Sequence, residues 1–459
     1  MYPARSLVRS IGTTGSALLA CTLLASLPTP AAETTADARN WPQFRGPGGV
    51  GVAPASAGPA IPREWNEQTI LWKTAIPGLG HSSPIVWGDR IFLTTAIEGE
   101  AIPGAQAPVH TLGGQEFKHP DAVGADKEHT LQVLALEAAT GKILWTQTSF
   151  QGRVFDDRHR ASSYASPTPV TDGERVYAYF GSEGTYAYDF AGKLVWSRDI
   201  GDIKAVGLGV ASSPVLWRDL LLVQADEDSG EASFIVALDR RTGAEVWRKP
   251  RPVQVSWTTP TLIAAPDGTE QLLTAGNEYL IAYDPASGSE LWRTKGLDSN
   301  AIHTPLQSGS TVVFSAGYPK KNVLALELPK QGDLTGGEPF SWTYDKGTAY
   351  VPSNLIYDGL LYLVNDSGIL TCLDARTGEL VYEGGRPAEQ GRFTASPTLV
   401  DGAILLISRD GDATFVKPGR QHEILASTSI DEPVAASPAV AGGRLYVRGE
   451  QHLYAIGAR

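Results

Sequence analysis

The chain has 459 residues, a formal net charge of −12 at pH 7 and charged side chains at 19% of its positions. An acidic chain without a basic run is a poor candidate for binding nucleic acid or an anionic membrane surface. The length also exceeds the usual size of a single domain, so the fold must be one that can grow with chain length.

Residues 1–32 have the features of a signal peptide. Arg5 and Arg9 precede an apolar run from Ile11 to Leu27, and small residues follow it. The run is too short and too weakly apolar for a stable membrane span. We therefore expect export to the periplasm or the cell exterior, with cleavage after Ala31 or Ala32. Two alternatives stay open, namely a lipoprotein attached to a membrane through Cys21 and a disordered N-terminus.

The mature chain is more acidic and holds one cysteine. Removal of residues 1–32 changes the formal charge from −12 to −14, because Arg5 and Arg9 leave and no acidic residue does. Only Cys372 then remains, so no internal disulfide can form. We expect a monomer that core packing and ring closure hold together.

Residues 33–66 are interpreted as an N-terminal arm. They include the stretch Asn40-Trp-Pro-Gln-Phe-Arg-Gly-Pro-Gly-Gly-Val-Gly51. Glycines after an arginine can indicate a phosphate-binding loop, but no strand precedes this stretch, no helix follows it and no Lys-Ser/Thr closes it. We expect an extended arm that Trp41 and Phe44 pin to the rest of the protein.

A hairpin pattern recurs along the remaining chain. In residues 237–247 the carboxylate of Asp239 can accept hydrogen bonds from the turn, Gly243 supplies a positive φ, and Trp247 falls on the second strand. Related stretches are residues 135–145, 187–196, 282–292 and 372–382, and another begins at Ala325. The residues that we interpret as structural are Trp72, Trp145, Trp196, Trp247, Trp292, Gly141, Gly243, Gly288 and Gly378.

A second pattern alternates with the hairpins: Ser or Thr, then Pro, then a strand, a Gly/Asp turn and another strand. Its positions are Pro84, Pro167, Pro214, Pro260, Pro305, Asn354 in place of a proline, Pro397 and Pro438. The spacings are 83 for the first step and then 47, 46, 45, 49, 43 and 41. A period of roughly 40–50 residues with four short strands is typical of a β-propeller.

The sequence therefore predicts an all-β, eight-bladed β-propeller over residues 67–459. The last unit, Ser437 to Ile456, has only three strands, whereas Thr69–Thr74 resembles a fourth strand without companions. The simplest account is that this N-terminal strand completes the eighth blade and so removes the exposed sheet edges.

The Asp-x-x-Thr-Gly-x-x-x-Trp hairpin resembles the tryptophan-docking motif of the quinoprotein propellers, whose repeats are also called PQQ-like. The resemblance covers nearly everything from about Trp72 to the C-terminus. Residues 40–51 also resemble the segment that leads into many secreted bacterial propellers of this kind. The likeness is specific for the fold and much less specific for function.

Two insertions enlarge the first unit, at residues 98–129 and 147–164. Loops between the second and third strands of a blade and loops between blades leave a propeller on the same face, so we expect the insertions to meet there. Long loops in compact folds are frequently functional. The candidate ligand face at this channel mouth comprises His81, Trp257, His303, Asp226, Asn277, Asp366, Arg409, Asp410 and Glu450. Ordinary turn and packing roles are the alternative for each of them.

The insertions also hold residue types that bind metals. These residues are His119, Asp121, Asp126, Glu128 and His129 in the first insertion and Asp156–Arg160 in the second. Their spacing matches no known site, so we expect solvated loops with salt bridges and no metal. The chain shows no Ser-His-Asp order and no nucleophile elbow, so no catalytic residue is predicted.

Three functions follow. The first is a non-catalytic extracytoplasmic binding or scaffold propeller without a cofactor, similar to the propeller lipoprotein of the bacterial outer-membrane barrel-assembly machinery. It would bind protein partners or a small ligand on the face with the insertions. The second is a PQQ-dependent alcohol or sugar dehydrogenase that also binds calcium. The resemblance implies that such enzymes usually hold the quinone against two adjacent cysteines, and this chain has no adjacent cysteines. Some quinoproteins bind the quinone without them, so this alternative stays open. The third is a polysaccharide-acting enzyme.

Overall fold

The structure is a computed structural model that describes residues 37–55 and 59–459. The predicted signal peptide and Cys21 lie outside the described residues. In the described part, the only helical segments are the short turns η1 (Pro47–Gly49) and η2 (Gly181–Glu183). None of the described helices is long and apolar enough to cross a membrane.

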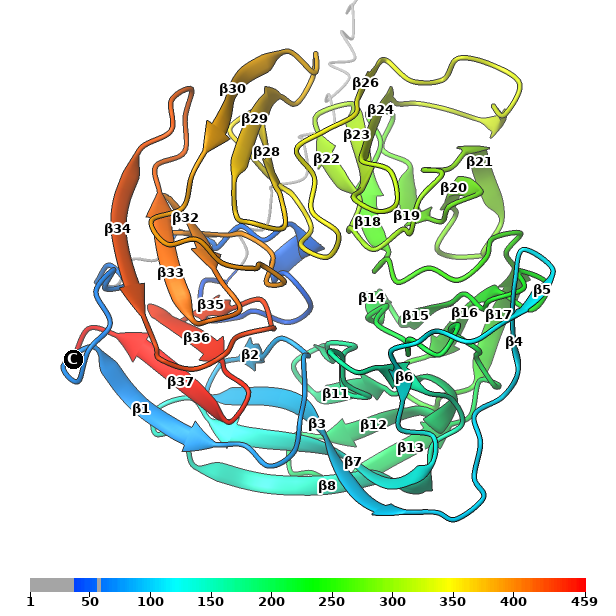
Figure 1. Cartoon of the computed structure of the whole chain (residues 1–459), viewed down its shortest axis with the longest axis horizontal. Helices are drawn as coiled ribbons and strands as arrows, with labels where there is room; N and C mark the ends of the chain where they lie inside the picture. The colour runs from blue at the N-terminus through cyan, green and yellow to red at the C-terminus, as the bar shows by residue number, and fades with distance from the viewer. Residues whose placement is uncertain (1–36, 56–58) are drawn as a thin grey trace, which may run out of the picture. The chain divides into compact units, whose positions relative to one another are not determined.

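Eight antiparallel sheets form a ring around a central channel, so the prediction of an all-β, eight-bladed propeller is confirmed (Figure 1). From the channel outward, blade 1 contains β2 (Ile85–Trp87), β3 (Arg90–Ala101), β7 (Lys127–Glu137) and β8 (Ile143–Arg153). Blade 2 contains β10 (Val170–Thr171), β11 (Arg175–Tyr179), β12 (Thr185–Asp189) and β13 (Leu194–Arg198). Blade 3 contains β14 (Val215–Trp217), β15 (Leu220–Ala225), β16 (Phe234–Asp239) and β17 (Glu245–Pro250). Blade 4 contains β18 (Thr261–Ala264), β19 (Glu270–Ala275), β20 (Tyr279–Tyr283) and β21 (Glu290–Lys295), with β25 (Gly332–Asp333) added in parallel.

The second half of the ring repeats this order. Blade 5 contains β22 (Leu306–Ser308), β23 (Thr311–Ala316), β24 (Asn322–Glu327) and β26 (Trp342–Tyr344). Blade 6 contains β27 (Leu355–Tyr357), β28 (Leu360–Val364), β29 (Leu370–Asp374) and β30 (Leu380–Gly385). Blade 7 contains β31 (Thr398–Val400), β32 (Ala403–Ile407), β33 (Asp412–Val416) and β34 (Ile424–Ser429). Blade 8 contains β35 (Ala439–Ala441), β36 (Arg444–Arg448), β37 (His452–Gly457) and β1 (Ile70–Ala75).

The hydrophobic core lies between neighbouring blades. Tyr177 and Trp196 of blade 2, for example, belong to one buried cluster with Leu221 and Val223 of blade 3. A four-stranded sheet has two apolar faces, and only a second sheet on each side can bury both. The repeated units therefore depend on one another for their stability.

The tryptophans of the hairpins lie at these joints. Each indole Nε1 donates to a carbonyl in the hairpin of the next blade at 3.0–3.2 Å, from Trp72 to Ala138, Trp145 to Phe190, Trp196 to Arg240 and Trp247 to Pro285. Trp292 differs, because its Nε1 donates to Gln271 Oε1 of its own sheet at 3.0 Å. The chain after Glu327 runs through Pro329 to β25, which pairs in parallel with β21 beside Trp292.

A belt of hydrogen bonds explains the recurring Ser or Thr beside proline. The backbone N–H of this residue in one blade donates to the hydroxyl of its counterpart in the next at 2.9–3.0 Å, from Ser83 to Thr168 to Ser213 to Thr259, and from Thr304 to Ser353 to Ser396 to Ser437. The belt thus consists of two runs of four blades. At the joint between blades 8 and 1, Arg448 Nη1 instead donates to Ser82 O at 3.0 Å and to Ser82 Oγ at 2.7 Å.

β1 is the outermost strand of blade 8 and pairs antiparallel with β37, with Lys73 opposite Tyr454 and Ala75 opposite His452. The first and last segments of the propeller thus share one sheet, and this sheet has no missing outer strand. The arm reaches β1 across blade 7, where Ile61 and Trp65 are buried.

Candidate functional site

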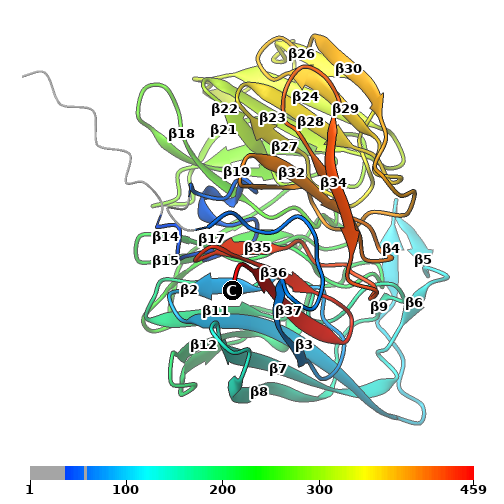
Figure 2. The same ribbon diagram turned by 90° about the vertical axis from the view of Figure 1, so that its left-hand side faces the viewer.

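The two insertions are partly strand, which corrects the expectation of irregular loops. β3 continues to Ala101, β7 begins at Lys127 and β8 continues to Arg153. Within the insertions, β4 (His110–Leu112) and β5 (Gln115–Phe117) form a hairpin, and β6 (Ala122–Val123) pairs with β9 (Arg158–His159). The longer hairpin of blade 1 carries its connection away from the ring, where it can pair with the chain that leads to blade 2. Figure 2 shows all four short strands on one side of the ring.

His110 anchors the first insertion between two buried carboxylates. Its Nε2 lies 3.0 Å from Asp156 Oδ1, in the connection to blade 2, and its Nδ1 lies 3.2 Å from Asp228 Oδ2, in the β15–β16 turn. All three side chains are buried. Both ring nitrogens face carboxylates, so a protonated imidazole is paired by charge with both, while Nδ1 alone has a hydrogen bond of good geometry among the described residues. Burial opposes that charge, but the two carboxylates outweigh it and raise the pKa of His110.

The anchoring carboxylates are themselves held by backbone amides. Asp156 Oδ2 accepts a hydrogen bond from Ala205 N at 2.9 Å, and Asp228 Oδ2 accepts one from Thr111 N at 2.9 Å. Asp228 Oδ1 is buried without a partner among the described residues. The insertion thus connects blades 1, 2 and 3 by ion pairs that are shielded from solvent.

Trp257 is a packing residue beneath this insertion. It is buried with Val206 and Val255, and Phe117 of the insertion packs against the same cluster. Its Nε1 donates to Gly209 O at 2.7 Å. A ring that is covered and hydrogen-bonded in this way cannot stack on a planar ligand without moving its neighbours. This geometry fits the packing role that was the alternative to ligand contact for Trp257.

The two histidines at the channel mouth are neutral at pH 7. His303 is buried with its Nδ1 2.9 Å from Ser315 Oγ, and burial, aided by the nearby positive charge of Arg45, lowers its pKa to about 4. Burial and the charges of Arg409, Arg448 and Arg158 lower the pKa of the half-buried His81 to about 3. Neither imidazole can act as a cation at neutral pH.

The remaining candidates of the ligand face do not converge on one point. Asp226 is wholly buried and paired with Arg251 at 2.7 Å, which corrects its assignment to an open ring of polar groups. Arg409 and Glu450 form an ion pair at 2.9 Å, and Asp366 accepts from Tyr350 N at 2.7 Å. Asn277 is half-buried and Asp410 is exposed.

In the structure, the insertion residues whose side chains commonly bind metals separate into two groups. His119, Asp121 and His159 come together from the two insertions. His129 is buried elsewhere, with its Nε2 3.0 Å from Gly124 O, and Asp126 and Glu128 lie outside the cluster. Sequence spacing could not identify the cluster, because one of its three members lies on the other insertion.

The N-terminal arm crosses the opposite end of the channel. Trp41 is fully buried and exchanges backbone hydrogen bonds with Val86 of blade 1. Arg45, which the sequence interpretation missed, is also buried, and its guanidinium donates to the carbonyls of Asn354 at 2.6 Å, Val50 at 3.0 Å and Gly49 at 3.3 Å. The Trp-x-x-x-Arg spacing in a glycine-rich stretch is the signal that could have indicated it. Phe44, which we expected to be a pin, is only half-buried.

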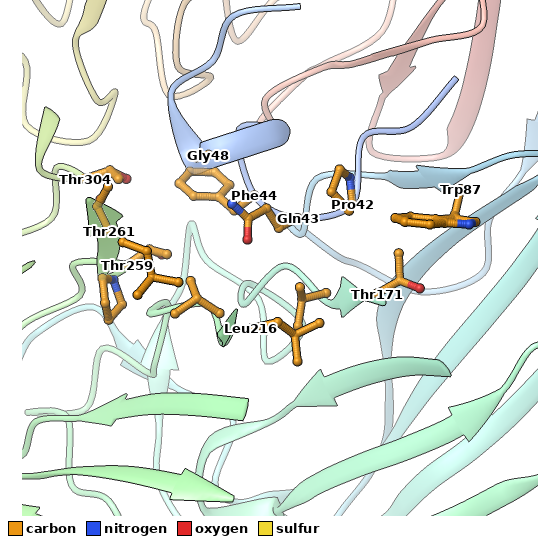
Figure 3. A pocket seen from close by; sticks show the side chains of 15 residues that line it. Pro42, Gln43, Phe44, Gly48, Trp87, Thr171, Leu216, Thr259, Thr261 and Thr304 are labelled. Atoms are coloured by element: carbon orange, nitrogen blue, oxygen red, sulfur yellow. The ribbon is translucent and has the colours of Figure 1, made fainter. Parts of the chain in front are cut away.

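A cavity of about 310 Å³ lies between the arm and the innermost strands of blades 1–4 (Figure 3). Phe44 and Gly48 line it from the arm, and Trp87, Leu216 and Thr261 line it from the blades. None of its lining residues is titratable. The cavity is therefore lined by apolar, hydroxyl and carboxamide groups and by no titratable side chain.

The comparisons with known proteins agree with this architecture. The family described as outer membrane protein assembly factor BamB matches residues 123–234 and 231–459. The quinoprotein ethanol dehydrogenase of Pseudomonas putida is 29% identical over 129 residues, which is 26% of this chain and 20% of that enzyme. The 1-butanol dehydrogenase (quinone) of Thauera butanivorans is 28% identical over 148 residues, which is 30% of this chain and 23% of that enzyme. The chain thus spans less than a quarter of the length of these curated relatives.

Solved structures show the same fold at low sequence identity. BamB from Moraxella catarrhalis superimposes with a TM-score of 0.52 at 15% identity, over 79% of this chain and 98% of that one. A europium-containing methanol dehydrogenase gives a TM-score of 0.58 at 12% identity, over 91% of each chain. Because the family match covers more than half of the sequence, the chain belongs to the family of the outer membrane protein assembly factor BamB.

Proposed function

We propose that this chain is a non-catalytic, exported propeller that binds a protein partner through the face carrying residues 98–129 and 147–164. The observation that supports this most is the anchored insertion, in which His110 is fixed while its neighbours Val109 and Leu112 are 64% and 41% exposed. Ordering a long surface segment costs conformational entropy, and exposing apolar side chains on it has no benefit for folding. A partner that covers these side chains accounts for both features.

Other exposed apolar side chains lie on the same face. Tyr318 follows β23, in the turn between the second and third strands of blade 5, and Val351 precedes β27. Both are exposed, and the Tyr318 and Tyr350 rings lie 5.0 Å apart. Aromatic side chains are enriched at protein interfaces, which fits a protein partner better than a small ligand. A small ligand on this face is the alternative within the same proposal.

A charge-insertion experiment tests this proposal. We expect Val109→Glu combined with Leu112→Glu to abolish chemical cross-linking to an extracytoplasmic partner in intact cells. The matched control is Val246→Glu combined with Leu194→Glu on the outer strands β17 and β13, where the exposed fractions are 52% and 47%. Unchanged circular dichroism of both variants shows that the propeller is folded. Equal cross-linking of both variants would contradict the proposed interface.

A PQQ-dependent dehydrogenase is the second candidate function, because the curated relatives are quinone-linked dehydrogenases. The residues of the insertion face do not fit the quinone and its calcium ion well. Trp257 is packed under Phe117, Asp226 is neutralised by Arg251, and the buried Cys372 has no adjacent cysteine. Calcium prefers several open oxygen ligands, which the paired Asp226 does not offer.

The dehydrogenase alternative has a direct test. The purified protein is incubated with the quinone and Ca²⁺, separated from free quinone by gel filtration, and examined for visible absorption and dye-linked alcohol oxidation. We expect no retained chromophore and no activity. A retained chromophore with dye-linked activity would favour the dehydrogenase over the binding propeller.

A further inference from the structure

Three metal-ligand side chains from the two insertions lie together on the surface. His119 and Asp121 belong to residues 98–129, and His159 belongs to residues 147–164. Their ligand atoms all lie within 4.8 Å of one another. His159 Nε2 is 3.7 Å from Asp121 Oδ2, and the centroids of the two imidazole rings are 5.7 Å apart. These separations are slightly wider than the ligand separations of a tetrahedral metal site.

The backbone brings these side chains together without a metal. Ala122 pairs with His159 in the β6–β9 ladder, and Arg160 N donates to Asp121 O at 2.8 Å. Each histidine also begins a tight turn, since Ala122 N donates to His119 O at 3.1 Å and Ser162 N donates to His159 O at 2.8 Å. The two turns therefore hold both imidazoles beside Asp121.

The ligand atoms of this cluster indicate which class of metal ion it would bind. Two imidazoles and one carboxylate suit Zn²⁺ and similar divalent transition metals, whereas Ca²⁺ and Mg²⁺ prefer sites made of oxygen ligands. All three side chains are partly exposed, which leaves a path for the ion and a position for water.

Existing hydrogen bonds compete with a metal at this cluster. Asp121 N donates to His119 Nδ1 at 3.1 Å, and Ala161 N donates to His159 Nδ1 at 3.0 Å. An imidazole that accepts at Nδ1 carries its proton at Nε2, so an ion that binds Nε2 shifts that proton to Nδ1 and releases the amide contact. Arg160 Nε also donates to Asp121 Oδ1 at 2.8 Å. These contacts predict moderate affinity that rises when Arg160 is removed.

We propose that His119, Asp121 and His159 form a site for a divalent transition-metal ion of the Zn²⁺ class, which ties the two insertions together. The ion bridges segments that are otherwise joined here by the short β6–β9 ladder and by side chains. Its binding therefore reduces local opening of residues 98–129 and 147–164 and leaves the blades unchanged.

The test uses Zn²⁺ alone with the purified mature protein. Isothermal titration is expected to show one site in the wild type, and His119→Gln combined with His159→Gln is expected to weaken binding by at least about tenfold. His422→Gln is the matched control, because this imidazole lies between blades 6 and 7 with its Nε2 2.8 Å from Arg386 O. Arg160→Ala is expected to tighten binding, and Ca²⁺ in excess is expected not to displace Zn²⁺.

Limited proteolysis supplies a second measurement. Zn²⁺ is expected to slow cleavage within the insertions of the wild type and of His422→Gln, but not in the double histidine variant. The proposal is overturned if the double variant binds Zn²⁺ as the wild type does, if Ca²⁺ displaces the ion, or if Zn²⁺ protects the double variant equally.

Discussion

At the scale of single residues, the joints depend on a tryptophan from one blade and a glycine from the next. Trp247 Nε1 donates to Pro285 O at 3.2 Å, and a Cβ on Gly288 would lie 2.5 Å from the indole ring. Gly288 also has a φ of 67°, which L side chains rarely adopt. The glycine of the repeated Thr/Ser-Gly turn thus serves two purposes, because it both permits the turn and makes room for the ring.

Trp247→Ala is expected to destabilise the protein by about 3–5 kcal/mol, because it removes a buried aromatic ring and leaves a cavity between blades 3 and 4. Equilibrium urea denaturation followed by circular dichroism measures the change. Val246→Ala, at the exposed neighbouring position, is the control and is expected to change stability by less than about 0.5 kcal/mol. Equal effects of the two changes would show that Trp247 does not hold the joint.

The substitution Gly288→Ala tests whether the glycine is needed only for its positive φ or also for the space that it leaves beside the ring of Trp247. A positive φ costs an alanine about 1–2 kcal/mol, and forcing a methyl group against the ring of Trp247 adds about 1–3 kcal/mol. Gly268→Ala is the matched control, since Gly268 has a φ of 84° and no atom within 4 Å of the added Cβ. We expect Gly288→Ala to lower the unfolding midpoint clearly more than Gly268→Ala. Indistinguishable midpoints would mean that only the backbone conformation matters.

At the scale of elements, the first insertion acts as a strap across blades 1–3. His110 between Asp156 and Asp228 supplies its main polar anchor, and Phe117 near Trp257 supplies an apolar one. Removing one partner from buried ion pairs leaves the others unpaired in a medium of low dielectric constant. The strap should therefore open locally when His110 loses its charge.

The strap is expected to loosen as the pH rises. The pKa of His110 is raised in the folded protein above the ordinary value of 6.5. Its ion pairs therefore stabilise the strap fully below that ordinary value, and this stabilisation is lost as the pH rises through the folded pKa. Burial raises the pKa of Glu183, near Asp156, to about 7, and this group acts in the same direction.

Amide hydrogen exchange of residues 102–126, measured at about pH 6 and about pH 9 and corrected for intrinsic rates, tests this prediction. His110→Gln is expected to lower protection at the lower pH, by about 1–3 kcal/mol in local opening free energy, and to remove most of the pH dependence. His422→Gln should behave like the wild type. A strap whose corrected protection is the same at both pH values would contradict the role of His110.

At the scale of the whole molecule, the ring has one joint that the chain must close between its two ends. There β1 pairs with β37, Arg444 Nη1 donates to Ala138 O at 2.6 Å, and Arg448 donates to Ser82. In the described part of the chain, the hydrogen-bond belt has no Ser437–Ser83 link at this joint. At this joint, the pairing of β1 with β37 and the hydrogen bonds donated by Arg444 and Arg448 replace the missing link of the belt.

Deletion of residues 69–74 is expected to expose the edge of β37, to lower the unfolding midpoint and to cause association, because unpaired sheet edges recruit other strands. Light scattering after gel filtration measures the association. The matched control replaces residues 330–338 with a short flexible linker, which removes β25 from blade 4 but opens no joint of the ring. If the deleted protein is as monomeric and as stable as this control, β1 does not close the propeller.

Much of the fold could be read from repeated local signals. The Asp-x-x-Thr-Gly hairpins and the Ser/Thr-Pro starts each specify a turn or a strand within about ten residues, and their period indicates the number of blades. The insertions were located by the same means, since they interrupt the period. Their meeting on one face followed from propeller topology, whereas their strand content did not.

The candidate site was much less predictable. Asp226 was expected at an open mouth, but Arg251 lies beside it in the folded chain and turns it into a buried ion pair. His110 gave no local signal and Arg45 gave only the Trp-x-x-x-Arg spacing, because their partners lie 118 and 309 residues away in Asp228 and Asn354.

The sequence by itself therefore determined the eight-bladed architecture, the recurring tryptophan and glycine positions and the place of the two insertions. Only the tertiary structure decided which polar residues are buried, which carboxylates face His110, and which histidines meet beside Asp121. The physical reason is the sequence range of the interactions that decide each feature. Turns and strand patterns are set by neighbours along the chain, whereas burial and ion pairing are set by neighbours in space, which closure of the ring brings together.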